Sequence, residues 1–348
     1  RRPTLGAMAC LTTIAAALGV ADEAGLARRL FVIEGQDARS TLGGRPAAPV
    51  EEFAAHVAAA LAESQIDPAR TIAWGFPVVW GFAEMVRRLG FRAVVVDLVD
   101  DQRAWQMTGK LRAEMEAEYA DSLKIADVVL TNCTGNQARF WPLRSDIQVI
   151  PNGAEIDWQA EKMPVPEVLA GIAPPIVGYV GNLRDRIDWE IIGQVARARP
   201  DWSVVLIGPQ GDDAAAAPDP RCPSNLHLPG PVPYEVARAC LRHFDVGIVP
   251  HLACEMTESM NPLKIYNYLA AGLPVVATAI PNLEGLADLI TIASDAESFV
   301  AAIAGALSRP REDRTPADRV QEFAWPRRID AMLRSVDARL SVPAVRPA

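Results

Sequence analysis

Asn261, Pro262 and Lys264 are the residues whose types and spacing point most directly to binding chemistry. Asn is a common helix cap and Pro fits the first helical position, so the pair predicts a helix that begins here and ends at Gly272. The free N–H groups of Leu263 and Lys264, with the Lys264 charge beside them, predict a site for an anion such as a diphosphate. The alternative is that Lys264 only extends to solvent.

Two further segments could serve the same anion. Gly181 ends an apolar run, and a glycine there lets the backbone approach a ligand closely. Arg184 or Arg186 could then reach a diphosphate with a guanidinium fork. The turn Leu228–Pro233 could present its backbone to a flat base, although strand–glycine–loop segments and proline turns are also common without any ligand.

Asp97, Asp100 and Asp101 close another apolar run. Carboxylates at the end of a buried strand face the cleft, where they could bind sugar hydroxyls. A metal site would need further ligands, which the neighbouring sequence lacks. Hydroxyl binding is therefore the favoured interpretation.

The elements that must position these residues alternate between strand and helix, which predicts an α/β protein with parallel sheets. The apolar runs are continuous, as in strands that are covered on both faces. Expected strands of the first half are Leu30–Glu34, Thr71–Gly75, Ala93–Leu98, Val128–Asn132 and Gln148–Ile150. Expected strands of the second half are Ile176–Val180, Ser203–Ile207, Leu226–Leu228, Val246–Val249, Val275–Thr278 and Leu289–Ile292.

We expect two doubly wound, Rossmann-like domains that face a cleft. The boundaries predicted are 1–160 for the N-terminal domain, 161–175 for a proline-dense linker, 176–324 for the second domain, and 325–348 for a segment that returns to the first. Because the chain opens with a helical pattern at Met8–Gly19 rather than a strand, we also expect the first strand of the N-terminal domain to be missing.

Composition excludes several classes of protein. The 348 residues include 34 Lys and Arg against 43 Asp and Glu, a net charge of −9, which argues against nucleic-acid binding. Five cysteines without a CxxC pair, and four histidines without an HExxH motif, argue against a disulfide framework and a zinc site. No apolar stretch is long enough to span a bilayer, and Met8–Val20 reads as a buried helix rather than a signal peptide. We expect a cytoplasmic protein with at most peripheral contact to the inner face of the membrane.

Several motifs together resemble the GT-B glycosyltransferases, in particular the retaining group 1 hexosyltransferases that include sucrose synthase and many bacterial polysaccharide enzymes. The segments that carry the resemblance are Ala126-Asp-Val-Val-Leu130, Val149-Ile-Pro-Asn-Gly153, Gly178-Tyr-Val-Gly181, Gly230-Pro-Val-Pro-Tyr234, Phe244-Asp-Val-Gly-Ile-Val-Pro250, Asn261-Pro-Leu-Lys264 and Tyr268-Leu-Ala-Ala-Gly-Leu-Pro-Val-Val276. The last two are similar to a subgroup with the pattern NPLKxYEYLAaGxPVV.

The sequence also departs from the family pattern. Asn267 stands where the family carries the Glu that holds the nucleotide ribose, and Ser259 stands at the position of an earlier Glu, with Glu258 beside it. The family's Arg and Lys after the first donor-domain strand correspond to Asn182 and Ile187, so Arg184 or Arg186 would replace them.

The resemblance implies hexose transfer from a nucleotide diphosphate sugar to a saccharide, lipid-linked or small-molecule acceptor, with retention and without a metal or other cofactor. The alternatives are a donor-binding pseudo-glycosyltransferase or scaffolding domain, and a nucleotide-sugar epimerase. The residues assigned are Lys264, Arg184, Arg186 and Glu258 for catalysis; Gly181, Asn182, Val232, Asn261, Leu263 and Asn267 for the nucleotide sugar; and Asp100 and Asp101 for the acceptor.

Overall fold

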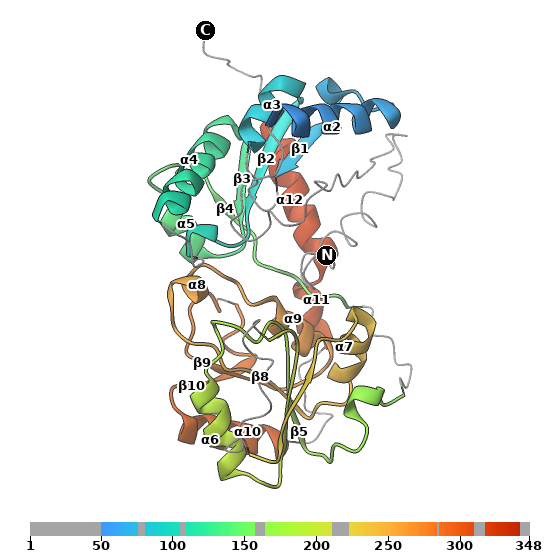
Figure 1. Ribbon diagram of the computed structural model, residues 1–348, viewed down its shortest axis with the longest axis vertical. Coiled ribbons are helices and arrows are strands. Elements are labelled where there is room, and N and C mark those ends of the chain that lie inside the picture. Colours follow the sequence, from blue (N-terminus) through green and yellow to red (C-terminus); the bar gives the residue numbers. More distant parts are fainter. Residues whose placement is uncertain are drawn as a thin grey trace.

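The computed structural model describes residues 50–75, 81–104, 109–156, 164–210, 223–283, 285–309 and 317–341. They form two α/β domains, with the first domain above the second in Figure 1. The expected strand Leu30–Glu34 lies outside the described residues. The predicted α/β class with two parallel sheets is confirmed.

The first domain holds a parallel sheet of four strands in the order β1-β2-β3-β4. Its strands are β1 (Ile72–Gly75), β2 (Ala93–Leu98), β3 (Val128–Thr131) and β4 (Gln148–Val149). Its helices are α2 (Val50–Glu63), α3 (Phe82–Leu89), α4 (Gly109–Ile125) and α5 (Thr134–Phe140), with short 3-10 turns at Pro68–Arg70 and Gln102–Ala104. Every residue of β2 and β3 is buried, as the continuous apolar runs predicted.

The second domain holds a parallel sheet of six strands in the order β10-β9-β8-β5-β6-β7, which is the Rossmann order. Its strands are β5 (Ile176–Val180), β6 (Ser203–Ile207), β7 (Leu226–Gly230), β8 (Val246–Val249), β9 (Val275–Thr278) and β10 (Ile290–Ala293). Its helices are α6 (Trp189–Ala198), α7 (Tyr234–Leu241), α8 (Glu255–Glu258), α9 (Leu263–Ala270) and α10 (Ala296–Leu307), and a 3-10 turn lies at Glu167–Leu169. The strand order reverses between β5 and β8, so the loops after these two strands flank the usual ligand crevice.

The side chains of β5 alternate between two cores. Val177 and Tyr179 pack with α6 and α10, whereas Ile176 and Val180 pack with α7 and α9. The helices α6 and α9 therefore cover opposite faces of the sheet. The loop after β5 consequently has α9 on one side and α6 on the other.

The chain crosses between the domains at two places that lie side by side. Ala154 and Ala324 form a parallel bridge, in which the Ala154 N–H donates to the Phe323 carbonyl at 2.8 Å and the Trp325 N–H donates to the Ala154 carbonyl at 3.1 Å. Ala154 and Leu169 both belong to the second-domain core. The first crossing therefore precedes the proline-dense segment expected as the linker, whose described part packs on the second domain.

The last described helices complete this connection. After α11 (Ala317–Glu322) the chain crosses back, and α12 (Trp325–Leu340) packs Met332 and Val336 against Val95, Val128 and other residues on the far face of the first sheet. Figure 1 shows α12 running along that sheet. The described helices include none with the length and apolar character that a bilayer crossing requires.

Candidate functional site at the edge between the two domains

A glycine lies at or directly after the carboxyl end of three adjacent strands of the second sheet, at Gly181, Gly208 and Gly230, which we call the glycine edge. The Gly181 N–H donates to the Ile207 carbonyl at 2.9 Å, and the Gly208 N–H donates to the Gly230 carbonyl at 3.1 Å. A Cβ atom on Gly208 would lie 1.8 Å from the Gly181 carbonyl oxygen. A side chain is therefore excluded at Gly208, where the backbone of the two strands comes too close to admit one.

The first turn of α9 lies beside this edge, but Asn261 does not cap it as predicted. The N-cap position belongs to Pro262, and no side chain in the described part of the chain caps the helix. Asn261 instead accepts a hydrogen bond from the Asn152 N–H at 2.9 Å and donates to the Asn282 carbonyl at 3.0 Å. The capping prediction is wrong because partners distant in sequence engage the side chain. The end of α9 is consequently left open to an anion.

Lys264 extends from the first turn of α9 toward the glycine edge. A Cβ atom on Gly181 would lie 3.1 Å from Lys264 Cε, and Lys264 Nζ lies 5.1 Å from the centre of the Tyr179 ring. Burial, and then the nearby Arg186 charge, lower the pKa of Lys264 to about 7, against the weaker opposing effect of Asp100. Lys264 is therefore enclosed at the site rather than directed away from it.

Arg186 and Asp100 face the same place from different domains. Arg186 Nη1 donates to the Met260 sulfur at 3.3 Å. Burial raises the pKa of Asp100, and the Arg186 and Lys264 charges oppose that rise. The fold therefore brings a carboxyl of the predicted acceptor side within electrostatic reach of two cations of the predicted donor side.

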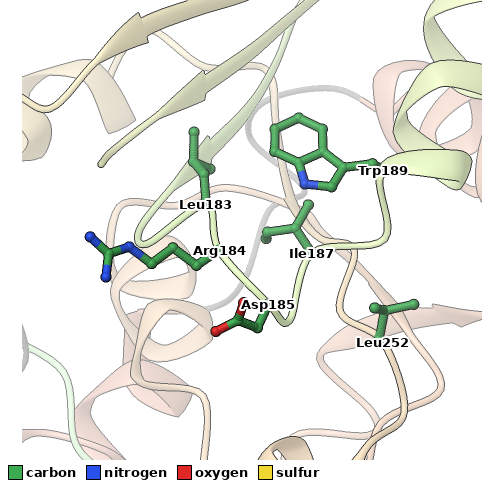
Figure 2. A pocket seen from close by; sticks show the side chains of 6 residues that line it. All are labelled: Leu183, Arg184, Asp185, Ile187, Trp189 and Leu252. Carbon is green, nitrogen blue, oxygen red and sulfur yellow. The ribbon is translucent and has the colours of Figure 1, made fainter. Parts of the chain in front are cut away.

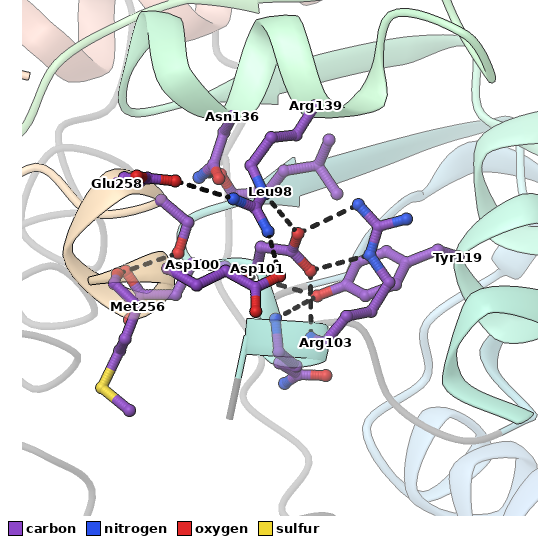
Figure 3. Close-up of polar contacts among 12 residues, drawn as sticks. Leu98, Asp100, Asp101, Arg103, Tyr119, Asn136, Arg139, Met256 and Glu258 are labelled. Carbon is purple, nitrogen blue, oxygen red and sulfur yellow. Dashed lines mark hydrogen bonds and ion pairs between the residues drawn. The ribbon is translucent and has the colours of Figure 1, made fainter. Parts of the chain in front are cut away.

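Asp101 has different surroundings from its neighbour. Its side chain is fully buried and accepts from Arg103 Nε at 2.9 Å and from Arg139 Nε at 3.0 Å (Figure 3). Burial alone would raise the pKa of Asp101, but the two arginines outweigh it and the pKa is lowered. This carboxylate is engaged in holding the first domain together, whereas Asp100 faces the cations.

Glu258 ends α8 and is directed at the first domain. Its carboxylate accepts from Arg139 Nη1 at 3.4 Å (Figure 3), and its side chain is 60% exposed. Its carbonyl accepts from Asn282 Nδ2 at 2.8 Å, and a Cβ atom on Gly135 would lie 2.2 Å from that carbonyl oxygen. The carboxyl end of α8 is therefore held tightly against α5.

The two arginines that sequence left as alternatives lie in different places. Arg184 lines a pocket of about 530 Å³, together with Leu183, Asp185, Ile187, Trp189 and Leu252 (Figure 2). Trp189 begins α6, on the face of the sheet opposite to α9. Asn182 is exposed, and its carbonyl accepts from the Tyr179 hydroxyl at 3.1 Å. Arg186 is thus the arginine beside Lys264, whereas Arg184 faces a neighbouring pocket.

The remaining predicted nucleotide residues lie along α9 and after β7. Leu263 is the first residue of α9, and Val232 packs partly buried against the second-domain core. Asn267 follows Lys264 on α9, and its buried Oδ1 atom has no hydrogen-bond partner among the described residues. An unpaired buried acceptor is costly, so this oxygen is available to a ligand donor.

Sequence reasoning missed Gly208, Tyr179 and His251. Gly208 could have been found, because it directly follows an apolar run in the same way as Gly181, which the sequence did identify. Tyr179 and His251 carried none, because an aromatic residue within a strand and a single histidine after one are ordinary core residues. Their roles depend on Lys264, which lies on another element.

Within the ranges that the structure describes, no group of three or more His, Cys, Asp and Glu side chains is arranged to hold a metal ion. The positive charge in this part of the molecule comes from Lys264, Arg186 and the first turn of α9.

Comparisons with known proteins show which family and which fold the chain is similar to. Residues 174–309 match the family model described as "Glycosyl transferases group 1". A curated relative, the putative teichuronic acid biosynthesis glycosyltransferase TuaH of Bacillus subtilis, is 27% identical over 146 residues. That match covers 40% of this chain and 36% of the relative. The chain therefore spans only about a third of the length of the relative.

Solved structures with the same fold cover most of the chain. Anabaena HepE, in its complex with UDP-glucose, has a TM-score of 0.63 at 15% identity and covers 84% of each chain. WaaG, a glycosyltransferase involved in lipopolysaccharide biosynthesis, has a TM-score of 0.60 at 15% identity and covers 95% of this chain and 96% of its own. The sucrose-phosphate synthase of Thermosynechococcus elongatus has a TM-score of 0.59 at 18% identity, with 83% and 78% covered. The expected two-domain GT-B fold is confirmed.

Proposed function

We propose that this protein, whose residues 174–309 match the group 1 glycosyl transferases and whose fold is similar to that of GT-B enzymes, transfers a hexose from a nucleoside diphosphate sugar to an acceptor. The acceptor would be a saccharide, a lipid-linked sugar or a small molecule. One observation carries the proposal: Lys264, Arg186 and the open end of α9 converge where the strand order reverses, and Asp100 faces them from the other domain. This arrangement suits a doubly charged diphosphate whose sugar points at the first domain.

In this proposal the diphosphate lies on the glycine edge, which presents backbone and no side-chain bulk. The nucleoside extends toward Asn267 and Val232, where the unpaired Asn267 oxygen can accept from a ribose hydroxyl. The fold neighbour HepE supports this class of donor, since its structures hold UDP-glucose in one case and UDP with glucose in another.

Bond breaking would place additional negative charge on the leaving nucleoside diphosphate. Lys264, Arg186 and the α9 N-terminus are fixed where that charge develops, so they stabilise it without reorganisation. This is the work that a divalent cation does in other transferases, and we propose that transfer proceeds without one. We propose retention of configuration, as in the hexosyltransferases that the sequence resembles.

The acceptor would lie between the donor sugar and Asp100. A half-buried carboxyl with a raised pKa can hold a sugar hydroxyl by hydrogen bonding at little cost. Rotation about the paired crossings at Ala154 and Ala324 would bring the two walls together and exclude water.

Titration calorimetry with a panel of nucleoside diphosphate sugars tests this function. Removing a charged contact to phosphate costs about 1.5–3 kcal/mol, so Lys264→Ala should weaken donor binding roughly ten- to hundredfold. Lys124→Ala is the matched control, because Lys124 is an exposed lysine of α4 in the first domain. Equal donor affinity of the two variants, with both folded, would remove Lys264 from the site.

Turnover separates an enzyme from a binding protein. Release of free nucleoside diphosphate in the presence of an acceptor mixture is the expected result. Tight donor binding with no release under any acceptor would favour the donor-binding pseudo-glycosyltransferase that Asn267 raises as an alternative.

A further inference from the structure

His251 follows β8 and lies beneath the anion site without a part in the function proposed so far. It is 1% exposed. Its backbone is clamped to Thr278, whose Oγ1 accepts from the His251 N–H at 3.0 Å and donates to the His251 carbonyl at 2.6 Å. The imidazole is consequently held in one place by the sheet.

Among the described residues, the His251 ring has two close polar neighbours at Nε2 and none at Nδ1. Its Nε2 atom lies 3.4 Å from Lys264 Nζ and 3.3 Å from the Tyr179 hydroxyl. Its buried Nδ1 atom has no hydrogen-bond partner among the described residues. A buried ring nitrogen without a partner costs stability, so a core position alone does not explain a histidine here.

Around His251 and Lys264 there is more positive than negative charge. Arg186 comes from the loop after β5, Lys264 from α9, and Asp100 from the first domain, and Tyr179 is a neutral phenol. The Tyr268 hydroxyl of α9 is engaged by the Val180 N–H. Burial, followed by the Lys264 and Arg186 charges, lowers the pKa of His251 well below its usual value. The imidazole is therefore neutral, and the enclosed amine beside it titrates near neutral pH.

A neutral imidazole has two possible hydrogen-bond arrangements at this position. The Tyr179 hydroxyl already donates to the Asn182 carbonyl, so it can only accept from His251, which requires a proton on Nε2. An ammonium has three donors and no acceptor, so charged Lys264 requires a bare Nε2. The protonation of Lys264 therefore selects which ring nitrogen of His251 carries the proton.

We infer that His251 is a positioning residue for Lys264, and that the donor diphosphate enters the site together with one proton that solvent delivers to Lys264 Nζ. The new ammonium donates one hydrogen to His251 Nε2 and directs the others at the diphosphate. In the imidazole the Nε2–H bond breaks and an Nδ1–H bond forms, with solvent carrying that proton, so the ring stays neutral and the site gains one proton in total. This inference rests on the proposed function, since it requires a diphosphate donor.

Calorimetry in buffers of different ionisation enthalpy measures the protons taken up with UDP-glucose, which has no phosphate group that titrates near pH 7. From a pKa of about 7 in the free protein, uptake should be about half a proton at pH 7, nearly one above pH 8 and close to none below pH 6. Donor binding without uptake at pH 8 overturns the inference alone. Absence of sugar-nucleotide binding at every pH overturns the proposed function, and the inference with it.

Variants of His251 separate positioning from packing. His251→Phe removes the acceptor and should weaken UDP-glucose binding about tenfold at pH 7, whereas His251→Gln keeps an acceptor and should restore most of that affinity. His243→Gln is the control, because His243 lies at the amino end of β8 and also has a buried ring nitrogen without a described partner. Equal weakening by the Phe and Gln variants would overturn the acceptor role.

Nitrogen NMR provides a readout that does not depend on the folding of any variant. The chain has four histidines, so ¹⁵N-histidine labelling gives few signals. The His251 ring should change from the Nε2-protonated to the Nδ1-protonated form as UDP-glucose is added at pH 8. An unchanged ring with the site saturated would contradict the proposed proton movement.

Discussion

Ala154 and Ala324 pair through two backbone hydrogen bonds at the point where the chain passes from one domain to the other. The two crossings are thereby joined to each other as well as to the domains. If the domains close on the donor as proposed, we expect the rotation to be centred on this short bridge, because both connections pass through it.

Gly153→Ala should disturb this bridge. A Cβ atom on Gly153 would lie 2.8 Å from the Phe323 carbonyl oxygen and 3.0 Å from the Trp325 ring, so the crossing must shift to accept it. We expect a loss of about 1–3 kcal/mol in the free energy of unfolding, measured in urea. Gly305→Ala in α10 is the control, since its added methyl group would meet no atom of a described residue within 4 Å. Equal stability of both variants would show that the crossing can shift to accept the methyl group at no cost in free energy.

Asp97 and Asp101 should respond to pH with opposite sign. Burial raises the pKa of Asp97 to about 6, so its charged form destabilises the folded state as pH rises from about 4 to 6. Asp97→Asn should therefore gain about 2–3 kcal/mol at pH 8 and nothing below pH 4. Asp101→Asn should lose stability at pH 8, because its lowered pKa reflects the two arginines that bind the carboxylate. Thermal unfolding across pH measures both.

Asn267→Ala should weaken nucleotide binding with little loss of stability. Its buried Oδ1 makes no hydrogen bond to a described residue, so the protein loses no internal bond at that atom. We expect roughly a tenfold rise in the dissociation constant of the nucleoside diphosphate. Asn136→Ala is a contrasting variant, because Asn136 donates to the Leu98 and Val99 carbonyls within the first domain. It should lower the melting temperature and leave nucleotide binding intact.

Sugar transfer should continue in an excess of chelator. Arg186, and Lys264 once it is protonated in the donor complex, supply positive charge where the leaving diphosphate would lie. The rate of nucleoside diphosphate release, measured with and without EDTA, checks this. A loss of activity that magnesium or manganese restores would redirect attention to Asp100 and the site of a bound ion.

The strands were predictable because burial on both faces produces continuous apolar runs, and Ala93–Leu98 and Val275–Thr278 have the predicted bounds. The cap at Asn261 was not predictable, since local preference favours a cap and only folding reveals Asn152 as a competing partner. The Pro164–Pro175 stretch has the composition of a linker, yet Leu169 is buried in the second-domain core.

Within the site, Lys264 and Asp100 were identifiable from their positions at the ends of elements. The choice of Arg186 over Arg184 depends on which side of the loop after β5 each side chain takes, which spacing does not encode. The role inferred for His251 depends on its contact with Lys264, which lies on another element, and no local sequence pattern reveals such a contact.

The position of α12 has a consequence for the order in which the protein folds during synthesis. Met332 and Val336 cover one face of the first sheet, but the ribosome makes them after the whole second domain. The first domain emerges early with Val95, Val128 and Leu130 uncovered, while the second can complete its own sheet before α12 appears. The first of these two domains can therefore be completed only after the second has been translated, and we expect the face that α12 covers to attract a nascent-chain chaperone until then.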